Sequence, residues 1–151
     1  MAFRGNFEYQ LDDRNRVALP SKFREAFANG AILVPGMDGC IEVYTPEGYE
    51  REATVVERVP AYSDEGRQLR RAFYGEAFDV QRDGQGRLLI PAKLLAYGGI
   101  ERDVVVVGTD QRLELWDRPT WEAQEESLQA ARARALQRLS ESPPTNGAEG
   151  D

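Results

Sequence analysis

The chain of 151 residues contains no histidine and only one cysteine. Without histidine there is no imidazole base, no histidine-based catalytic triad and no histidine metal ligand. Because Cys40 is alone, it has no partner for a disulfide within the chain and no second thiol for a zinc site. We therefore interpret Cys40 as a packed structural thiol, and we expect neither a metal nor a cofactor.

Long apolar runs are also missing. No segment approaches the ~20 apolar residues that a membrane-spanning helix needs. The opening MAFRGNFEYQ has no apolar core of the kind found in signal peptides. The sequence therefore predicts a cytoplasmic protein with no membrane partner.

Positive charge is in deficit, because the net charge is −7. For a protein that binds nucleic acid, however, the local distribution of charge matters more than the total. Two windows, residues 1–24 and 67–93, each carry more basic than acidic side chains, while acidic residues gather in 42–65 and after 101. The local charge thus permits a DNA contact, and the acidic remainder limits nonspecific attachment.

What the sequence does contain is an internal repeat. The segment DGQGRLLIPAK at 83–93 repeats DDRNRVALPSK at 12–22, and LELW at 113–116 repeats IEVY at 41–44. Self-similarity at a fixed spacing indicates two copies of one structural unit. The chain thus presents one charged loop twice, in equivalent places.

Each copy has the pattern of a unit that mixes strands and helices. Alternating apolar and polar residues from Phe3 to Leu11 predict a half-buried strand, and Pro20 ends the strand that returns after the loop. Thr45 followed by Pro46 has the signature of a helix start. We expect strands at 3–11, 17–19, 32–34, 40–44, 75–81, 87–90, 103–107 and 112–116, and helices at 21–28, 49–59, 65–74, 92–97 and 122–139.

The repeated loop has the residues of a rigid turn. A carboxylate at the start of a tight turn accepts hydrogen bonds from backbone N–H groups further along, which gives a reason for Asp12 and Asp83. Asn15 and Gly86 precede the loop arginine in the two copies, and these residue types tolerate positive φ best. We expect the loops to be organised by Asp12, Asn15, Asp83, Gly84 and Gly86.

Hydrogen-bond donors crowd the same loops. Arg16 and Arg87 follow the turns and are placed to pair with the loop carboxylates, while Arg14, Arg82 and Gln85 suit phosphate or guanine. A single Asp-x-x-x-Arg is more often a surface ion pair worth under ~1 kcal/mol, so the duplication and the extra cations are what favour DNA contact. The candidate DNA-binding residues are Arg14, Arg16, Lys22, Arg82, Gln85 and Arg87.

Other interpretations are weaker. The segment 84–86 lacks the lysine and serine of a P-loop and fits a turn better. Asp12, Asp13 and Asp38 lack the regular spacing of a calcium loop. No paired acids suited to catalysis stand outside the turns, so we expect no enzyme. Several aromatic residues recur at matching places in the two copies, which favours core packing over base stacking: Phe3, Phe7, Tyr44, Tyr49, Trp116 and Trp121.

Four segments occur in order along the chain: FRG at 3–5, LDDRNRVALPSKFRE at 11–25, RDGQGRLLIPAKL at 82–94 and VVVVGTDQRLELWDRPTW at 104–121. Together, in this order, they resemble the MraZ family of bacterial transcriptional regulators. It implies an α+β fold in which tandem swapped-hairpin AbrB-type repeats form a pseudo-twofold double split β-barrel with flanking helices. The family's signatures fall on 12–16 and 83–87, and Asn15 departs from the glycine that is common there.

This resemblance also suggests a division of the chain. We expect a first AbrB-like repeat at 3–48, a helical connector at 49–73 and a second AbrB-like repeat at 74–121. A C-terminal helix at 122–139 and a disordered tail at 140–151 would follow, because the last dozen residues are nearly free of hydrophobic side chains.

The function implied by the resemblance is sequence-specific DNA binding by a transcriptional regulator. It would bind repeated sites in its own promoter region as a ring-shaped homo-oligomer, repress its own cell-division and cell-wall gene cluster, and be nucleoid-associated. Its partners would be double-stranded DNA and further copies of itself, with no small-molecule substrate. The alternative is an antitoxin-like AbrB module that binds a toxin protein, which the short tail with few hydrophobic anchors disfavours.

Overall fold

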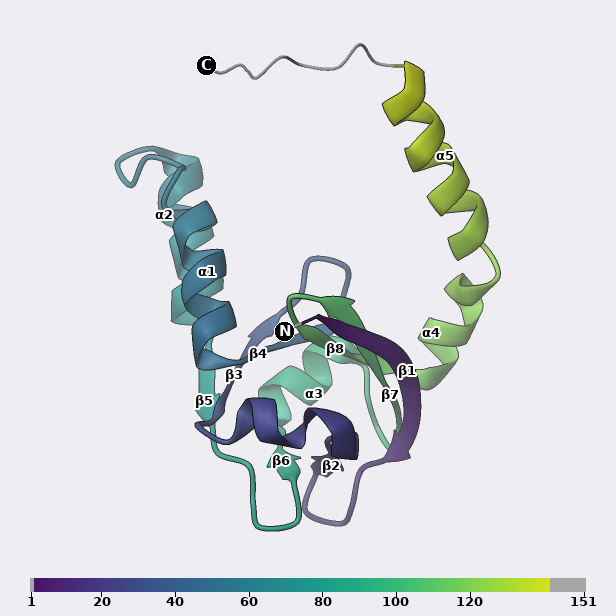
Figure 1. Cartoon of the computed structure of the whole chain (residues 1–151). Helices are drawn as coiled ribbons and strands as arrows, with labels where there is room; N and C mark the ends of the chain where they lie inside the picture. The colour runs from purple at the N-terminus through teal and green to yellow at the C-terminus, as the bar shows by residue number, and fades with distance from the viewer. Residues whose placement is uncertain (1, 142–151) are drawn as a thin grey trace. The chain divides into compact units, whose positions relative to one another are not determined.

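The computed structural model describes residues 2–141, and the chain divides after Arg118 into two compact units (Figure 1). Residues 142–151, most of the tail expected at 140–151, lie outside the described residues. The strands are β1 (Phe3–Gln10), β2 (Arg16–Ala18), β3 (Ala31–Pro35), β4 (Ile41–Tyr44), β5 (Phe78–Val80), β6 (Arg87–Leu89), β7 (Asp103–Asp110) and β8 (Leu113–Asp117). The helical elements are η1 (Ser21–Phe27), α1 (Pro46–Val56), α2 (Asp64–Arg70), η2 (Arg71–Gly75), α3 (Ala92–Gly98), α4 (Arg118–Glu125) and α5 (Leu128–Glu141).

The strands of the first unit exchange partners between the two copies of the repeat. One sheet has six strands in the order β1-β7-β8-β4-β3-β5, all antiparallel, and β2 pairs with β6 in a second, two-stranded sheet. β1 therefore pairs with β7 of the other copy, and β5 pairs with β3. The fold is α+β as expected, but within residues 2–141 β1 and β5 remain the edges of the large sheet, so its ladder does not close into a barrel.

A shared core explains why the two copies form one unit. Phe3 of β1 packs edge-on against Phe23 and stacks on Phe27, both from η1, with ring centroids 5.0 and 5.6 Å apart. Leu94 from α3 and Val106 from β7 are buried in the same cluster. Removing this apolar surface from water stabilises the fold by about 25 cal/mol per Å². The core thus fixes the positions of the strands that carry the loops.

Aromatic packing also joins the helical connector to the sheet. The ring of Tyr49 in α1 stacks on Phe73 at 4.4 Å, and its hydroxyl donates a 2.8 Å hydrogen bond to the Phe73 carbonyl. Tyr44 of β4 packs edge-on against both. The assignment of aromatic residues to core packing is confirmed by burial of five of them, Phe3, Tyr44, Tyr49, Trp116 and Trp121, and Phe7 is half-buried.

Local sequence accounts for most helix boundaries. Thr45 caps α1 by accepting a 2.9 Å hydrogen bond from the Gly48 N–H, as expected from the Thr-Pro pair. Three expectations differ from the structure in kind, besides shifts of boundaries. The helix expected at 65–74 is α2 followed by the π-helical η2. The helix at 21–28 has 3₁₀ geometry, and the helix expected after Trp121 is two helices, α4 and α5, separated at residues 126–127. None of the helices in the described part of the chain is both long and apolar enough to cross a membrane.

Candidate nucleic-acid interface

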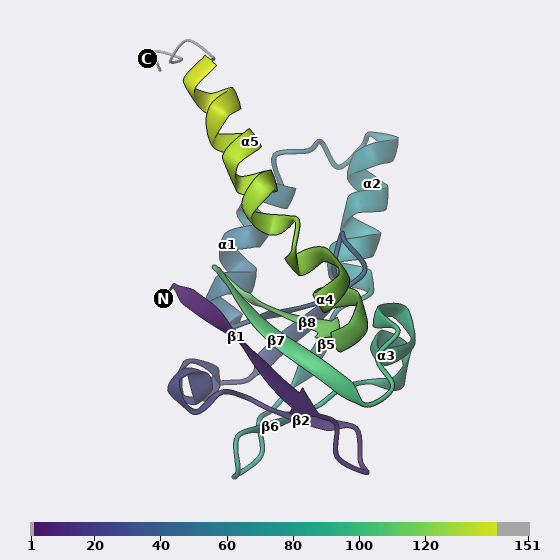
Figure 2. The ribbon, with the colours of Figure 1, turned by 90° about the vertical axis from the view of Figure 1, so that its right-hand side faces the viewer.

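The two repeated loops lead into neighbouring strands. One connects β1 to β2 and the other connects β5 to β6, and the pairing of β2 with β6 brings their bases together (Figure 1). Seen from a second direction, both loops still extend from the same end of the sheet (Figure 2). Residues far apart in the sequence are therefore brought to the same end of the unit (Figures 1 and 2).

Each loop is held by the carboxylate at its start. Asp12 Oδ1 accepts hydrogen bonds from the N–H groups of Arg14 and Arg16 at 2.9 and 2.8 Å, and Asp12 Oδ2 accepts one from Arg16 Nε at 2.7 Å. Asp83 makes the same three bonds to Gln85 and Arg87, at 2.9, 2.9 and 2.7 Å. A carboxylate with three donors fixes both the turn and the first arginine of the return strand.

The residue before each arginine has a left-handed backbone. Asn15 has φ 60° and Gly86 has φ 77°, so the expectation of positive φ at both positions is confirmed. The carbonyl of Asn15 accepts a 2.9 Å hydrogen bond from Ile90 N–H, and that of Gly86 accepts one of 2.9 Å from Leu19 N–H. Each turn is thus bonded to the return strand of the other copy, which couples the two loops.

Four charged side chains complete this coupling, and we call them the charge quartet: Asp12, Arg16, Asp83 and Arg87. Beyond the pairs within each loop, Arg16 Nη1 lies 3.7 Å from Asp83 Oδ2, and Arg87 Nη1 lies 3.7 Å from Asp12 Oδ2. The backbone hydrogen bond from Arg87, aided by its side chain, lowers the pKa of Asp83 from 3.8 to about 2. The corresponding bonds from Arg16 lower the pKa of Asp12. Both carboxylates are therefore charged across the physiological range.

The donor side chains of the loops fall into two groups: those already bonded to carboxylates of the quartet and those that are not. Arg16 and Arg87 already donate Nε to carboxylates, and both side chains are only partly exposed. Arg14 and Gln85 are exposed at the tips, whereas Arg82 is half-buried and its Nε has no hydrogen-bond partner among the described residues. The donors open to a ligand are therefore concentrated at the tips rather than in the quartet.

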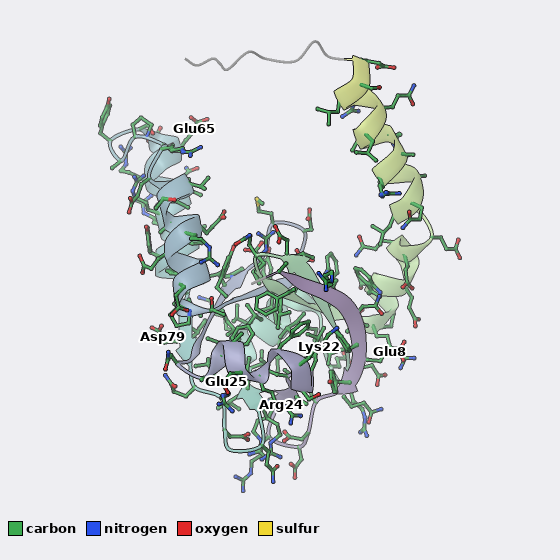
Figure 3. The ribbon with its side chains drawn as sticks, viewed as in Figure 1. Glu8, Lys22, Arg24, Glu25, Glu65 and Asp79 are labelled. Atoms are coloured by element: carbon green, nitrogen blue, oxygen red, sulfur yellow. The ribbon has the colours of Figure 1, made fainter. Side chains whose placement is uncertain are left out.

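Lys22 lies apart from the quartet. Its ammonium is over the rings of Phe7 and Phe23, 5.2 and 5.3 Å from their centroids. Figure 3 shows Lys22 on the side of η1 toward β1 and Arg24 on the side toward the loops. Lys22 is exposed, and no ion pair fixes it to a carboxylate within the described residues.

Arg24 is a loop-supporting residue that sequence reasoning missed. Its Nε donates a 3.1 Å hydrogen bond to the Leu19 carbonyl, and a Cβ at Gly86 would lie 2.5 Å from Arg24 Cδ and Nε. Gly86 is thus needed both for its φ and for the close approach of Arg24. The available signal was the break in the repeat, because Leu95 stands in the second copy where Arg24 stands in the first.

Comparison with known proteins agrees with the repeat. The family described as "MraZ protein, putative antitoxin-like" matches this chain over residues 2–71 and again over 73–140. A protein of Thermomicrobium roseum named "Transcriptional regulator MraZ" is 38% identical over 91% of this chain and 96% of its own length. Proteins of the same name from Dehalococcoides mccartyi and Micrococcus luteus are 36% and 39% identical, covering 92% and 79% of this chain and 99% and 83% of their own lengths. The double match and these relatives show that the chain belongs to the MraZ family.

Proposed function

We propose that this protein is a transcriptional regulator that binds double-stranded DNA through its paired loops. The observation that carries the proposal is the charge quartet, which holds two donor-rich tips in one fixed arrangement. A preorganised pair of tips loses little conformational entropy on binding. The names of the relatives support regulation of transcription, and such a protein acts at the nucleoid.

The geometry supports a division of roles among the loop residues. Arg16 and Arg87 act as positioning residues, since their Nε atoms are already bonded to the carboxylates. Arg14, Arg82 and Gln85 make the contacts with phosphate oxygens and base edges, and Lys22 adds a phosphate contact. Phosphate contacts set the register on the duplex, while an arginine or glutamine at a base edge contributes about 1–3 kcal/mol of discrimination.

The arrangement of the chain supports the repeat architecture. We infer tandem swapped-hairpin AbrB-type repeats at 3–48 and 74–121, related by a pseudo-twofold axis and joined by the connector at 49–73. The exchange of strands and the matching hydrogen bonds of the two loops support this assignment. A double split β-barrel remains part of the proposal, with residues 122–139 as a C-terminal helical segment.

Assembly explains how an acidic protein binds DNA tightly enough to regulate. One pair of loops offers few phosphate contacts, but a ring-shaped homo-oligomer presents many identical pairs. If the DNA sites repeat at the spacing of the subunits, avidity increases by about 10²–10⁴. We propose that the ring binds repeated sites in its own promoter region and represses its cell-division and cell-wall gene cluster.

Fluorescence anisotropy tests DNA binding directly. We would compare the duplex upstream of this gene with a shuffled duplex across a salt series, using wild type, Arg14→Ala/Gln85→Ala, and Arg58→Ala/Arg71→Ala as a control on exposed connector arginines. We expect preference for the upstream duplex, and loss of affinity only in the loop variant. Each lost phosphate contact should reduce the slope of log K against log salt by about 1.

A second candidate is favoured by one observation, the antitoxin-like description of the matching family. In that case the protein binds a toxin protein as its main partner. Equal, weak binding of wild type to both duplexes, unchanged in the loop variant, would contradict the DNA proposal and favour this candidate.

A further inference from the structure

The helix α5 presents an apolar stripe that its own unit, residues 119–141 of the described chain, does not bury. Leu128, Leu136 and Leu139 are 36%, 52% and 71% exposed, and no residue of α5 is buried. Residues three, four and seven apart share a helix face, so Leu128, Ala135 and Leu139 form one stripe with Leu136 at its margin. An amphipathic helix gains most of its stability by burying such a face, so α5 requires a partner surface.

A matching apolar hollow lies in the first unit, between the connector helices and the sheet. It encloses about 110 Å³, comparable with the ~150 Å³ apolar cavities that take up benzene-sized ligands. Its rim includes Met37, whose side chain is 87% exposed. The apolar lining includes Val34, Tyr44, Val56, Leu69, Ala72 and Phe73.

The hollow carries excess negative charge. Glu42 and Glu52 line it together with Arg112, whose guanidinium lies 3.6 Å from both Glu42 and Glu114. Glu42 is buried and accepts a 2.8 Å hydrogen bond from the Tyr44 hydroxyl. Two carboxylates and one guanidinium therefore line the hollow, and Glu114 lies beside that guanidinium, so the site suits an occupant that is apolar and cationic together.

We propose that α5 of one copy docks into this hollow of a neighbouring copy, in a head-to-tail contact that builds the oligomer. The leucines would fill the hollow while Arg132, on the same face as the stripe, and Arg138, beside it, face its carboxylates. A contact between two different surfaces repeats from copy to copy and closes into a ring when the rotation allows it. This inference rests on the self-assembly proposed above.

Pairing of α5 with another α5 is disfavoured by charge. Arg132 follows Leu128 by four residues and so lies on the face that two paired helices would share. The helix carries three arginines, at 132, 134 and 138, against one carboxylate, at 141. Bringing two such faces together opposes like charges, whereas the acidic hollow neutralises them.

Complementary variants of the full chain test the contact. Met37→Arg places a cation at the exposed rim of the hollow, and Leu136→Glu/Leu139→Glu alters only the stripe. Each variant alone should fall to the 17.0 kDa mass of one chain in light scattering. An equal mixture should form a species of twice that mass, because one intact hollow and one intact stripe remain.

Matched controls separate this contact from misfolding. Ala130→Glu/Ala133→Glu adds the same charge to the opposite face of α5, and Tyr62→Arg adds the same cation at an exposed site outside the hollow. Both should keep the mass of the wild type. If Met37→Arg loses its circular dichroism spectrum, Ala72→Arg, at another exposed lining residue, replaces it.

The other outcomes overturn the inference. A hollow variant that forms dimers would mean that α5 pairs with itself, and a mixture that stays monomeric would mean that the hollow and the stripe do not bind each other. Single variants that keep the mass of the wild type would place the subunit contact elsewhere while the oligomer stands. A monomeric wild type would overturn both the ring and this contact, whereas loss of DNA binding by an intact oligomer would overturn only the DNA proposal.

Discussion

Replacing Gly86 by alanine tests whether the second loop depends on the close approach of Arg24. An alanine at φ 77° costs about 1 kcal/mol, because its Cβ crowds the following carbonyl oxygen. The new Cβ would also lie 2.5 Å from Arg24 Cδ and Nε, so Arg24 must move and lose its hydrogen bond to the Leu19 carbonyl. A hydrogen bond from a charged donor contributes about 1.5 kcal/mol. We therefore expect a total destabilisation of about 2.5 kcal/mol.

The assay is urea unfolding of a double-mutant cycle. In an Arg24→Ala background the clash is absent, so Gly86→Ala should cost only about 1 kcal/mol and the coupling energy should be about 1.5 kcal/mol. Asn15→Ala, at the corresponding position of the first loop, should cost less than about 1 kcal/mol because asparagine is already an L-residue at positive φ. If the free energies of Gly86→Ala and Arg24→Ala add, or if alanine costs the same at positions 15 and 86, the second loop does not depend on the close approach of Arg24.

Three further predictions concern the quartet, the connector and the thiol. Because folding lowers the pKa of Asp83 from 3.8 to about 2 and that of Asp12 in the same direction, their stabilisation is present above pH about 4 and is lost as the pH falls toward about 2. Asp12→Asn/Asp83→Asn should flatten this part of a plot of urea midpoint against pH, and an unchanged slope would contradict the assignment. Tyr49→Phe removes the hydroxyl that donates to the buried Phe73 carbonyl, so the free energy of unfolding in urea should fall by about 1 kcal/mol. An unchanged free energy of unfolding would contradict this hydrogen bond. Cys40 is 1% exposed and burial raises its pKa to about 12, so the native thiol should resist iodoacetamide and react on unfolding, whereas rapid native labelling would show an open site.

Features set by neighbouring residues could be predicted from the sequence. The residue types of Asn15 and Gly86 predict positive φ, and the proline after Thr45 predicts a helix cap there; the structure has both. These depend on steric and hydrogen-bonding rules that act within a few residues. The strands and connector helices were located for the same reason, although several boundaries shifted by one or more residues.

Features set by tertiary pairing could not be predicted in this way. The repeat identified equivalent strands but not their partners, and the pairing of β1 with β7 is established only by the folded core. The contacts across the quartet at 3.7 Å follow from the pairing of β2 with β6. The contact of Arg24 with Gly86 is similarly long-range. The residues after Trp121 favour a helix, and the structure has one there. Their helix propensity does not, however, locate the break at 126–127.

Site-specific crosslinking tests directly whether the loop tips contact DNA. A photoreactive benzoylphenylalanine would be placed at Gln85, at Arg14 or, as a control, at the exposed connector residue Tyr62, and each protein irradiated with the upstream duplex or a shuffled one. We expect crosslinks from positions 85 and 14 to the upstream duplex that weaken as salt increases, and none from position 62. Crosslinks from position 62 alone, or equal crosslinks from all three positions to both duplexes, would contradict this expectation.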